Sequence, residues 1–167
     1  MDKELHRVVT TCIIYQKDKY LILQRSLEKK AFPGQWTVAG GGLTVEDYVN
    51  TPKTTKDVWY FGLDKTLRRE IKEETNLAVG DFSYLLDMTF IRSDNIPVVI
   101  LSFFAPYKSG TVKLDSDSIN FAWISVKDLK KYDLIGGIRE EILMADRILK
   151  GKKINNKGTF FKKLLKY

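Results

Sequence analysis

One helix-forming segment, residues 64–75, lies between two stretches that favour β-structure, and this arrangement limits the fold more than any other feature. Leu63, Leu67 and Ile71 recur at four-residue spacing and give the segment one apolar side. The aspartate at its first position is expected to cap the helix, and Asn76 to end it in the left-handed conformation. A helix with one apolar side, placed between strands, has to pack on a sheet. The chain is therefore expected to be an α/β protein.

The stretches on either side of this helix predict the strands of the sheet. Residues 8–15 and 20–24 are rich in β-branched and aromatic side chains and flank a polar turn, which is the pattern of a β-hairpin. A short strand is expected at 36–38, and the three glycines at 40–42 are expected to stop regular structure. Further strands are predicted at 82–90, 98–107 and 121–124, and helices at 125–132 and, after the glycines at 136–137, at 138–150. This order predicts a mixed β-sheet with helices packed on it.

Length and composition restrict the class of protein. The chain has 167 residues and is expected to form one domain over residues 1–150, followed by a tail at 151–167. Its one cysteine, Cys12, excludes a disulfide within the chain and argues against a zinc site built on cysteines. No apolar run approaches the ~20 residues of a membrane span, and no signal region follows the charged N-terminus. We therefore expect a cytoplasmic protein without a membrane partner.

The net charge of +7 comes from the C-terminal tail. Seven lysines and no acid lie between residue 150 and the C-terminus, whereas basic and acidic residues balance in the rest of the chain. Residues 160–167 form a short basic amphipathic stretch, a pattern that suits RNA or an anionic membrane. We favour the simpler interpretation, in which the tail packs on the domain or on a second copy of the chain. No nucleic-acid partner is expected, and the chain is expected to be a monomer or a homodimer.

The predicted helix carries three carboxylates on one face. Glu70, Glu73 and Glu74 have the spacing i, i+3 and i+4, so they are neighbours on the helix surface and repel one another. A hard divalent ion such as Mg²⁺ would compensate this repulsion, because it prefers oxygen ligands and keeps waters and phosphates in its shell. The alternative is a solvated acidic face flanked by basic side chains.

The wider context favours the metal. Residues 69–77 resemble the core of the Nudix box, with Arg69-Glu70 as its R-E pair and Glu73-Glu74 as its E-E pair. Upstream, residues 32–41 are similar to the family's proline- and glycine-rich approach, with Ala39 in place of the second proline. Residues 121–125 resemble its late aromatic strand. The resemblance implies a Nudix-type α/β/α sandwich with a mixed β-sheet.

The sequence departs from the box at two positions. Between Asp47, which stands where the motif has a glutamate, and Arg69 there are 21 residues instead of seven, so the box contains an insertion, assigned to residues 48–60. Asp47 or its neighbour Glu46 is expected to replace the missing acid, which in the family supports the arginine or the metal shell. Asn76 replaces the final glycine, a mild change because asparagine tolerates the left-handed conformation.

The resemblance implies a metal-dependent hydrolase that cleaves a diphosphate linkage. Its metal ligands would be Glu70, Glu73 and Glu74, together with the backbone of Gly41, and Arg69 would orient a glutamate. The expected metal is Mg²⁺, with Mn²⁺ as the alternative. A metal can neutralise the anionic diphosphate and lower the pKa of an attacking water. The general base would be one of the glutamates or Asp117, for which a plain turn residue is the alternative.

Candidate substrate contacts lie outside the helix. Arg25 is assigned to a phosphate, because a guanidinium binds two phosphate oxygens at once. Phe32, Trp36, Tyr48 and Trp59 are candidate stacking rings for a nucleobase, with core packing as the alternative for each. Because the last two rings lie in the insertion, we expect that loop to act as a lid or specificity loop.

Three function classes remain open from the sequence. The leading one is hydrolysis of a nucleoside diphosphate-linked substrate, which includes nucleoside triphosphates, nucleotide sugars and dinucleotides. The second is a nucleotide-binding module without activity, which the interrupted box allows. The third is an enzyme similar to isopentenyl diphosphate isomerase, but that family uses a cysteine near the glycine loop and this chain has only Cys12, on its first predicted strand.

Overall fold

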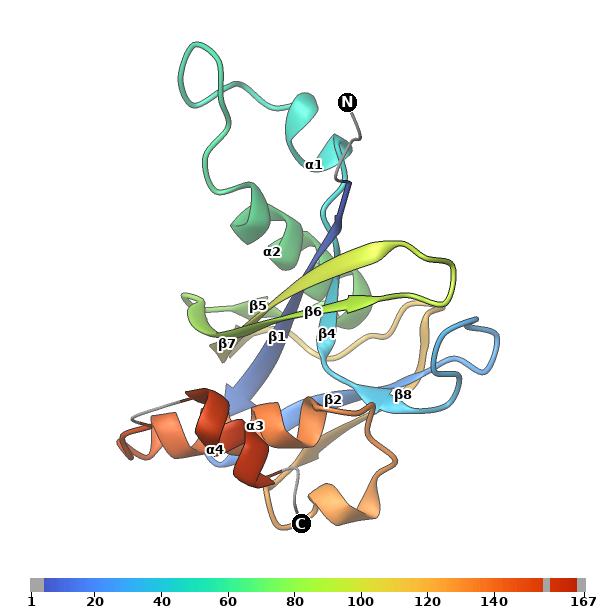
Figure 1. Ribbon diagram of the computed structural model, residues 1–167, viewed down its shortest axis with the longest axis vertical. Helices are drawn as coiled ribbons and strands as arrows, with labels where there is room; N and C mark the ends of the chain where they lie inside the picture. Colours follow the sequence, from blue (N-terminus) through green and yellow to red (C-terminus); the bar gives the residue numbers. More distant parts are fainter. Residues whose placement is uncertain (1–4, 155–156, 165–167) are drawn as a thin grey trace.

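The computed structural model describes residues 5–154 and 157–164, which form a mixed sheet with helices on both faces (Figure 1). The predicted α/β class is confirmed. The strands are β1 (Arg7–Gln16), β2 (Lys19–Arg25), β3 (Trp36–Thr37), β4 (Ala39–Gly42), β5 (Ala78–Val79), β6 (Ser83–Ile91), β7 (Pro97–Ser109) and β8 (Ser118–Ile124). The helices are α1 (Glu46–Val49), α2 (Gly62–Thr75), α3 (Ile138–Leu149) and α4 (Lys157–Leu164), with a 3₁₀ turn at Leu129–Lys131.

Strand β1 lies at the centre of the sheet. It pairs antiparallel with β2 through the predicted hairpin and antiparallel with β4, and it pairs parallel with β7 from Arg7 opposite Val98 to Tyr15 opposite Pro106. Strand β6 pairs with β7, and β8 with β2, both antiparallel. Buried isoleucines and Cys12 on β1 explain this central place, because a strand covered on both faces needs apolar side chains on both.

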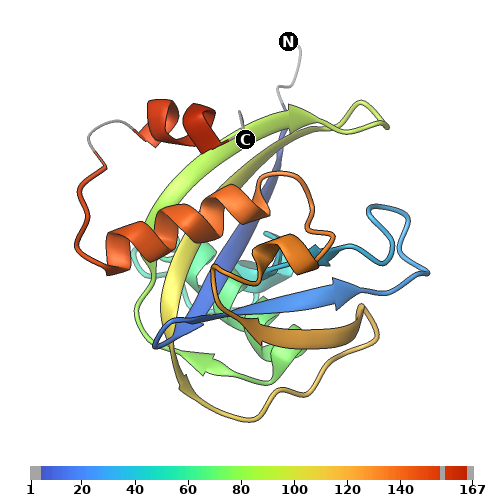
Figure 2. The same cartoon turned by 90° about the horizontal axis from the view of Figure 1, so that it is seen from below.

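Two helices cover opposite faces of the sheet. The apolar side of α2, with Leu67 and Ile71, packs on one face against Cys12, Ile14 and their neighbours. Helix α3 crosses the other face, where Ile138 and Ile142 join a second apolar cluster around strands β1 and β2 (Figure 2). The apolar side of the glutamate-bearing helix therefore holds this helix against the sheet.

The glycines at 40–42 were expected to stop regular structure, and this was wrong. They continue as β4, with Gly40, Gly41 and Gly42 opposite residues 11, 10 and 9 of β1. A Cβ on Gly40 would lie 2.2 Å from the carbonyl oxygen of Thr10, so only glycine lets the strand approach β1 this closely. The missing side chains also leave room for polar groups from neighbouring elements.

Helix α2 starts two residues earlier than predicted and ends where expected. Asp64 was predicted to cap the start, but Phe61 holds the cap position without a side-chain cap, and Asp64 instead pairs with Arg68 at 2.9 Å. Asn76 has φ of 60°, and its amide donates to the carbonyl of Lys72. The left-handed helix end is thus confirmed.

The insertion at 48–60 begins within the short helix α1 and projects from the body of the molecule (Figure 1). Its own side chains hold it together. Tyr48 and Trp59 are in ring contact at 5.3 Å between centroids, and the Trp59 indole donates to the carbonyl of Thr51 at 2.9 Å. Lys53 lies over the Trp59 ring at 5.1 Å. The loop is therefore an ordered arm and not a flexible linker.

The tail contains helix α4, one of whose rings reaches the domain. Phe160 packs against the apolar cluster beneath α3, and the Arg147 guanidinium lies 5.4 Å from its ring centroid. The predicted amphipathic stretch extends to residue 167, and residues 165–167 lie outside those described. Within the described residues, no helix has the length and hydrophobicity that crossing a bilayer requires.

Candidate active site

Two glutamates of α2 approach the glycine strand β4. The Gly40 amide donates to Glu74 Oε2 at 2.8 Å. A Cβ on Gly41 would lie 2.2 Å from the Glu70 carboxyl carbon, so this carboxylate rests directly against the Gly41 backbone. The packing of α2 on β4 thus brings the carboxylates at i and i+4 to two consecutive glycines.

Arg69 connects the carboxylates of this region. Its guanidinium contacts Glu70 at 2.9 Å, Glu73 at 2.7 Å and Asp47 at 2.5 Å. Its pKa is raised above the ordinary value, chiefly by the hydrogen bond to Asp47. Glu73 is the most exposed of the three acids, with 55% of its side chain accessible, so it lies at the rim of the site.

Asp47 contacts the motif arginine in spite of the insertion. Its side chain is 3% exposed, accepts from the Thr44 amide at 2.9 Å and accepts from the Thr66 hydroxyl at 2.9 Å. The Arg69 hydrogen bond is the main cause that lowers the Asp47 pKa to about 2. Glu46, the other candidate, is an exposed residue on the first turn of α1. The extra residues therefore project outward after Asp47 and leave its contact with the helix intact.

Burial raises the pKa of the two acids next to the glycines. Desolvation is the largest cause that raises the Glu74 pKa to about 8, and the charges of Glu70, Asp115 and Asp117 raise it further. Desolvation also raises the pKa of Glu70, against the lowering effect of Arg69. A cation placed between such carboxylates would relieve both the desolvation and the mutual repulsion.

These acids fit a divalent cation that also binds waters and substrate. Among the described residues, no three acidic, histidine or cysteine side chains converge into a ready-made metal cage. A hard cation such as Mg²⁺ needs only one or two carboxylates when phosphates and waters complete its shell. Glu70 and Glu74, which face adjacent glycines and lie close enough to couple electrostatically, meet that requirement.

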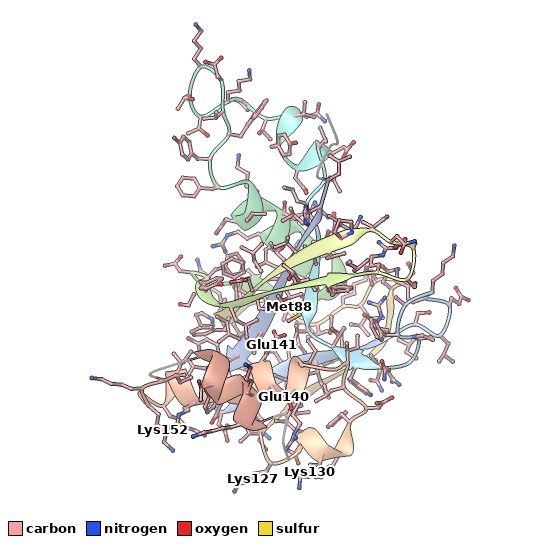
Figure 3. The ribbon with its side chains drawn as sticks, in the orientation of Figure 1. Met88, Lys127, Lys130, Glu140, Glu141 and Lys152 are labelled. Carbon is pink, nitrogen blue, oxygen red and sulfur yellow. The ribbon has the colours of Figure 1, made fainter. Side chains whose placement is uncertain are left out.

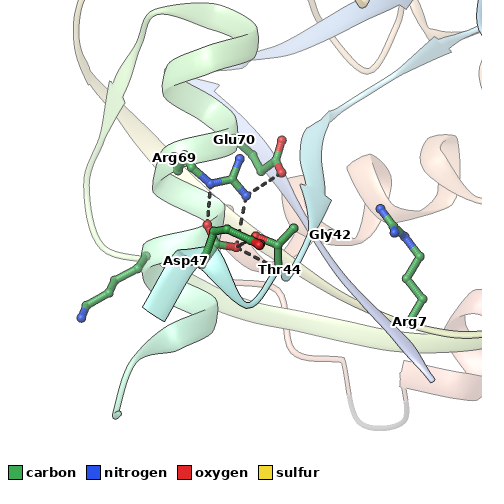
Figure 4. A pocket seen from close by; sticks show the side chains of 8 residues that line it. Arg7, Gly42, Thr44, Asp47, Arg69 and Glu70 are labelled. Carbon is green, nitrogen blue, oxygen red and sulfur yellow. Dashed lines mark hydrogen bonds and ion pairs between the residues drawn. The ribbon is translucent and has the colours of Figure 1, made fainter. Parts of the chain in front are cut away.

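A pocket of about 580 Å³ adjoins this site (Figure 4). Asp47, Arg69 and Glu70 line it, and Glu46 does so as well. Four further residues line it, of which Gly42 belongs to the glycine run at 40–42 and Arg7, Thr44 and Lys65 belong to no motif. A lone arginine or lysine carries no motif signal, so the sequence alone gave no means of finding them.

The other polar candidates lie in loops. Asp117 forms an ion pair with Lys29, and its charge acts on Glu74, so it lies on the Glu74 side of the site. Arg25 donates from Nε to the carbonyl of Ala31 at 2.9 Å and so closes the loop after β2. The structure thus brings Asp117 toward the glutamates and engages Arg25 in a loop contact.

The candidate rings do not gather around the carboxylates. Trp36 is half-buried and meets Tyr132 edge to face at 4.9 Å between centroids, on the α3 side of the sheet. Tyr48 and Trp59 contact each other within the insertion. Phe32 is 52% exposed in a loop. None of these four lines the pocket beside Glu70.

The comparisons with known proteins agree with this arrangement. A family model described as NUDIX domain matches residues 5–144, most of the chain. The protein belongs to the NUDIX domain family.

Individual relatives refine this assignment. The nucleoside triphosphatase NudI of Klebsiella pneumoniae (strain 342) is 26% identical over 146 residues, which cover 80% of this chain and 92% of that protein. A MutT NUDIX hydrolase from Burkholderia pseudomallei is similar in structure, with a TM-score of 0.66 and 19% identity over 84% of this chain and 98% of that one. The NUDIX domain of Shewanella oneidensis NrtR, solved with ADP ribose, has a TM-score of 0.64 and 19% identity over 89% and 90% of the two chains. These likenesses confirm the sandwich fold.

The family fixes the enzyme class. The chain is a Nudix hydrolase, which cleaves a diphosphate linkage, and enzymes of this family need a divalent metal ion. Cys12 supports no isomerase-like role. It lies opposite Ala39, but it is 1% exposed, and burial raises the pKa of its thiol. A buried, protonated thiol is a poor nucleophile or acid catalyst.

Proposed function

We propose that this protein hydrolyses nucleoside triphosphates in a Mg²⁺-dependent reaction, with Mn²⁺ as a substitute ion. The observation that carries the proposal is the approach of Glu70 and Glu74 to consecutive glycines, since it puts two carboxylates beside the strand backbone, and Glu70 also lines a pocket. The substrate class is supported by the relative named nucleoside triphosphatase, which matches 80% of this chain.

Each residue of the site has a separate role in this proposal. Glu70 and Glu74 would hold the metal with the backbone of Gly41, and Glu73 at the rim would complete its shell. The metal would supply charge neutralisation of the diphosphate and a water of lowered pKa. Arg69 orients Glu70 and Glu73, and Asp47 in turn holds Arg69. Such supporting contacts fix ligand geometry and so determine metal affinity.

One of the three glutamates also serves as general base in this proposal. Asp117 is the second candidate, but its ion pair with Lys29 competes with that role. The Gly40 amide orients Glu74 by its hydrogen bond, which keeps one carboxylate oxygen directed at the strand and the other available. The chain therefore provides a positioned acceptor beside the metal ligands.

The test is a substrate panel with a chemical readout. Purified protein is given Mg²⁺ and nucleoside triphosphates, ADP-ribose, dinucleoside polyphosphates or nucleotide sugars, and the nucleotide products are separated and quantified by ion-exchange chromatography. We expect the highest kcat/KM with a nucleoside triphosphate and no turnover in the presence of a chelator. A higher kcat/KM with another substrate class would overturn the proposed substrate, and no turnover at all would overturn the proposed activity.

A matched pair of variants assigns the turnover to this site. Glu74→Gln removes a proposed metal ligand, whereas Glu28→Gln changes an exposed glutamate in a distant part of the sequence by the same chemistry. We expect activity to be lost in the first and kept in the second. Equal loss in both would point to a contaminating or unrelated activity.

A further inference from the structure

Gly42, the last glycine of β4, faces an arginine. A Cβ on this residue would lie 2.6 Å from a terminal nitrogen of Arg7, so the guanidinium occupies the space that a side chain would fill. Val9 is opposite Gly42 in the sheet, and Arg7 lies two residues before Val9, on the same face of β1. Gly41 faces Glu70 in the equivalent way. The glycine strand thus has a carboxylate on one side and a guanidinium on the other.

Arg7 lacks a counter-charge in the part of the chain that the structure describes. No ion pair or hydrogen bond joins its side chain to residues 5–154 or 157–164. Of the three acids that line the pocket, Asp47 and Glu70 are paired with Arg69, and the exposed Glu46 forms no ion pair with Arg7. Arg7 is therefore a cation beside the site that has no charged partner among the described residues.

One pocket connects the Glu70 side of β4 with its Arg7 side. Arg7 and Glu70 line one pocket of about 580 Å³, and Figure 4 shows them on either side of the strand that ends at Gly42. Within the described sheet, β4 pairs with β1 alone, so no strand covers its other edge, where the Gly40 amide donates to Glu74. A flexible anionic ligand can therefore pass along this edge from Glu70 to Arg7.

We propose that Arg7 binds the phosphate of a nucleoside triphosphate that lies beyond the reacting diphosphate, an inference that rests on the proposed function. One residue along a strand rises about 3.4 Å, comparable to the step between successive phosphates. A diphosphate held at Gly40 and Gly41 would thus place a third phosphate near Gly42. A guanidinium binds two oxygens of such a group at once. Arg7 is then a specificity residue that favours triphosphates over diphosphates with neutral ends.

Direct binding tests this role without turnover. Inorganic tripolyphosphate and pyrophosphate are titrated calorimetrically into wild type and Arg7→Gln in the presence of Mg²⁺. We expect the variant to bind tripolyphosphate about tenfold more weakly, the usual size of one charge-assisted contact, and pyrophosphate within about twofold of wild type. Equal tripolyphosphate affinity in both proteins, or equal loss for both anions, would overturn the inference.

Two further variants separate position from charge. Gly42→Ala keeps Arg7 but puts a methyl group where its guanidinium lies, and the flexible side chain must move. We expect a loss of tripolyphosphate affinity in the same direction and smaller than that of Arg7→Gln. Lys127→Gln removes one positive charge at the opposite end of the molecule (Figure 3) and should leave both affinities unchanged. A loss in Lys127→Gln equal to that in Arg7→Gln would reduce the effect to net charge and overturn the inference.

Steady-state kinetics then separates the proposed function from the proposed role of Arg7. If the wild type turns over nucleoside triphosphates and Arg7→Gln raises their KM about tenfold with little change in kcat, both the function and the role of Arg7 are supported. Turnover that is indifferent to Arg7 overturns the inference alone. Tripolyphosphate binding that depends on Arg7, without turnover of any triphosphate, overturns the proposed function and leaves the anion site in place.

Discussion

Helix α2 carries a half-buried glutamate, Glu74, and helix α3 a buried one, Glu141, against opposite faces of the same sheet, and the two sites differ in what surrounds the carboxyl group. Glu74 on α2 accepts from the Gly40 amide and lies near the charges of Glu70 and Asp117. Glu141 on α3 is 1% exposed, and its Oε2 is hydrogen-bonded to the Ser102 hydroxyl at 2.7 Å (Figure 3). Ser102 is in turn bonded to Thr11 at 2.8 Å.

The difference indicates which charge each site can accept. Burial is the largest cause of the raised pKa at both positions, about 8 for Glu74 and about 7 for Glu141. At Glu74, the charges of neighbouring acids make a cation a suitable partner. At Glu141 the neighbours are hydroxyls in the core, and Oε1 lacks a hydrogen-bond partner among the described residues. The α2 glutamate is therefore suited to hold a metal ion, and the α3 glutamate to remain protonated.

The largest expected effect is that of Glu74→Gln on activity. Removing a metal ligand forfeits several kcal/mol of transition-state stabilisation, so we expect kcat/KM to fall on the order of 1000-fold. The free energy of unfolding of Glu74→Gln should be higher than that of wild type, because a neutral amide avoids the burial of a charge. Steady-state kinetics and chemical denaturation in a chelator at pH 8 measure the two quantities.

The opposite pattern, lower stability with activity retained, would mean that Glu74 is a structural residue like Glu141. The comparison between the two helices would then lose its basis. Adding Mg²⁺ provides a second check, because it should stabilise the wild type against unfolding more than it stabilises Glu74→Gln.

The next effect is the pH dependence of stability at Glu141. The unfolded chain loses this proton near pH 4.5, whereas the raised pKa keeps it on the native state up to about pH 7. The contribution of Glu141 is therefore complete below pH 4.5 and is lost as the pH rises through 7. We expect wild type to lose about 2 kcal/mol relative to Glu141→Gln between pH 5 and pH 8. Urea denaturation of both proteins across this range measures the difference.

The contributions of other acidic groups to the pH dependence of stability have to be separated from that of Glu141 in this experiment. Glu140 adds to its raised pKa, and Glu74 titrates with the same sign. The difference between wild type and Glu141→Gln cancels the shared contribution of Glu74, provided that both proteins are measured in a chelator. A difference that stays constant from pH 5 to pH 8 would show that Glu141 is not protonated in the native state.

The sequence allowed the α2 site to be predicted far better than the α3 site. Three glutamates at helical spacing carry a visible pattern, the apolar spacing predicted the helix and its end at Asn76, and the spacing of the box left Asp47 and Glu46 as alternatives for the missing acid. Glu141 carries no such pattern. Its burial depends on the hydroxyls of Thr11 and Ser102, which β1 and β7 bring together across 91 residues of sequence.

The glycine strand marks the limit of local reasoning. Glycine disfavours strands when considered alone, so Gly40 and its neighbours were expected to end the sheet. They form a strand because tertiary contacts, with Thr10 and Glu70 among them, require positions without a Cβ. The same contacts hid Arg7, since nothing near it in the sequence signals the pocket that it lines.

A smaller effect is expected at Asp47, which supports the α2 site through its ion pair with Arg69. Asp47→Asn weakens the contact that holds Arg69, and we expect metal affinity and kcat/KM to fall about tenfold, with a stability loss of about 1–2 kcal/mol at neutral pH. The lowered Asp47 pKa, about 2, means that its contribution is present above pH 4 and is lost as the pH falls toward 2. Denaturation and metal titration at pH 7 provide the measurements.

Glu46→Gln is the matched control, because this neighbour is exposed and lies on the same turn of α1. It should leave stability and metal affinity unchanged. If the two variants behave alike, Asp47 does not stand in for the motif glutamate, and the insertion has displaced that acid from the site.

The smallest effect is expected from the arm at 48–60, and it tests whether the arm belongs to the α2 site at all. Trp59→Ala removes the ring contact with Tyr48 and the hydrogen bond to Thr51, both inside the arm, so we expect a stability loss below about 1 kcal/mol. If the arm acts as a lid, the loosened loop should still change the ranking of kcat/KM among triphosphates and nucleotide sugars. Because its rings contact each other and not the pocket, an unchanged ranking in Trp59→Ala and in a variant with a shortened arm would leave the arm outside catalysis. Substrate choice would then depend on groups that line the pocket, such as Arg7.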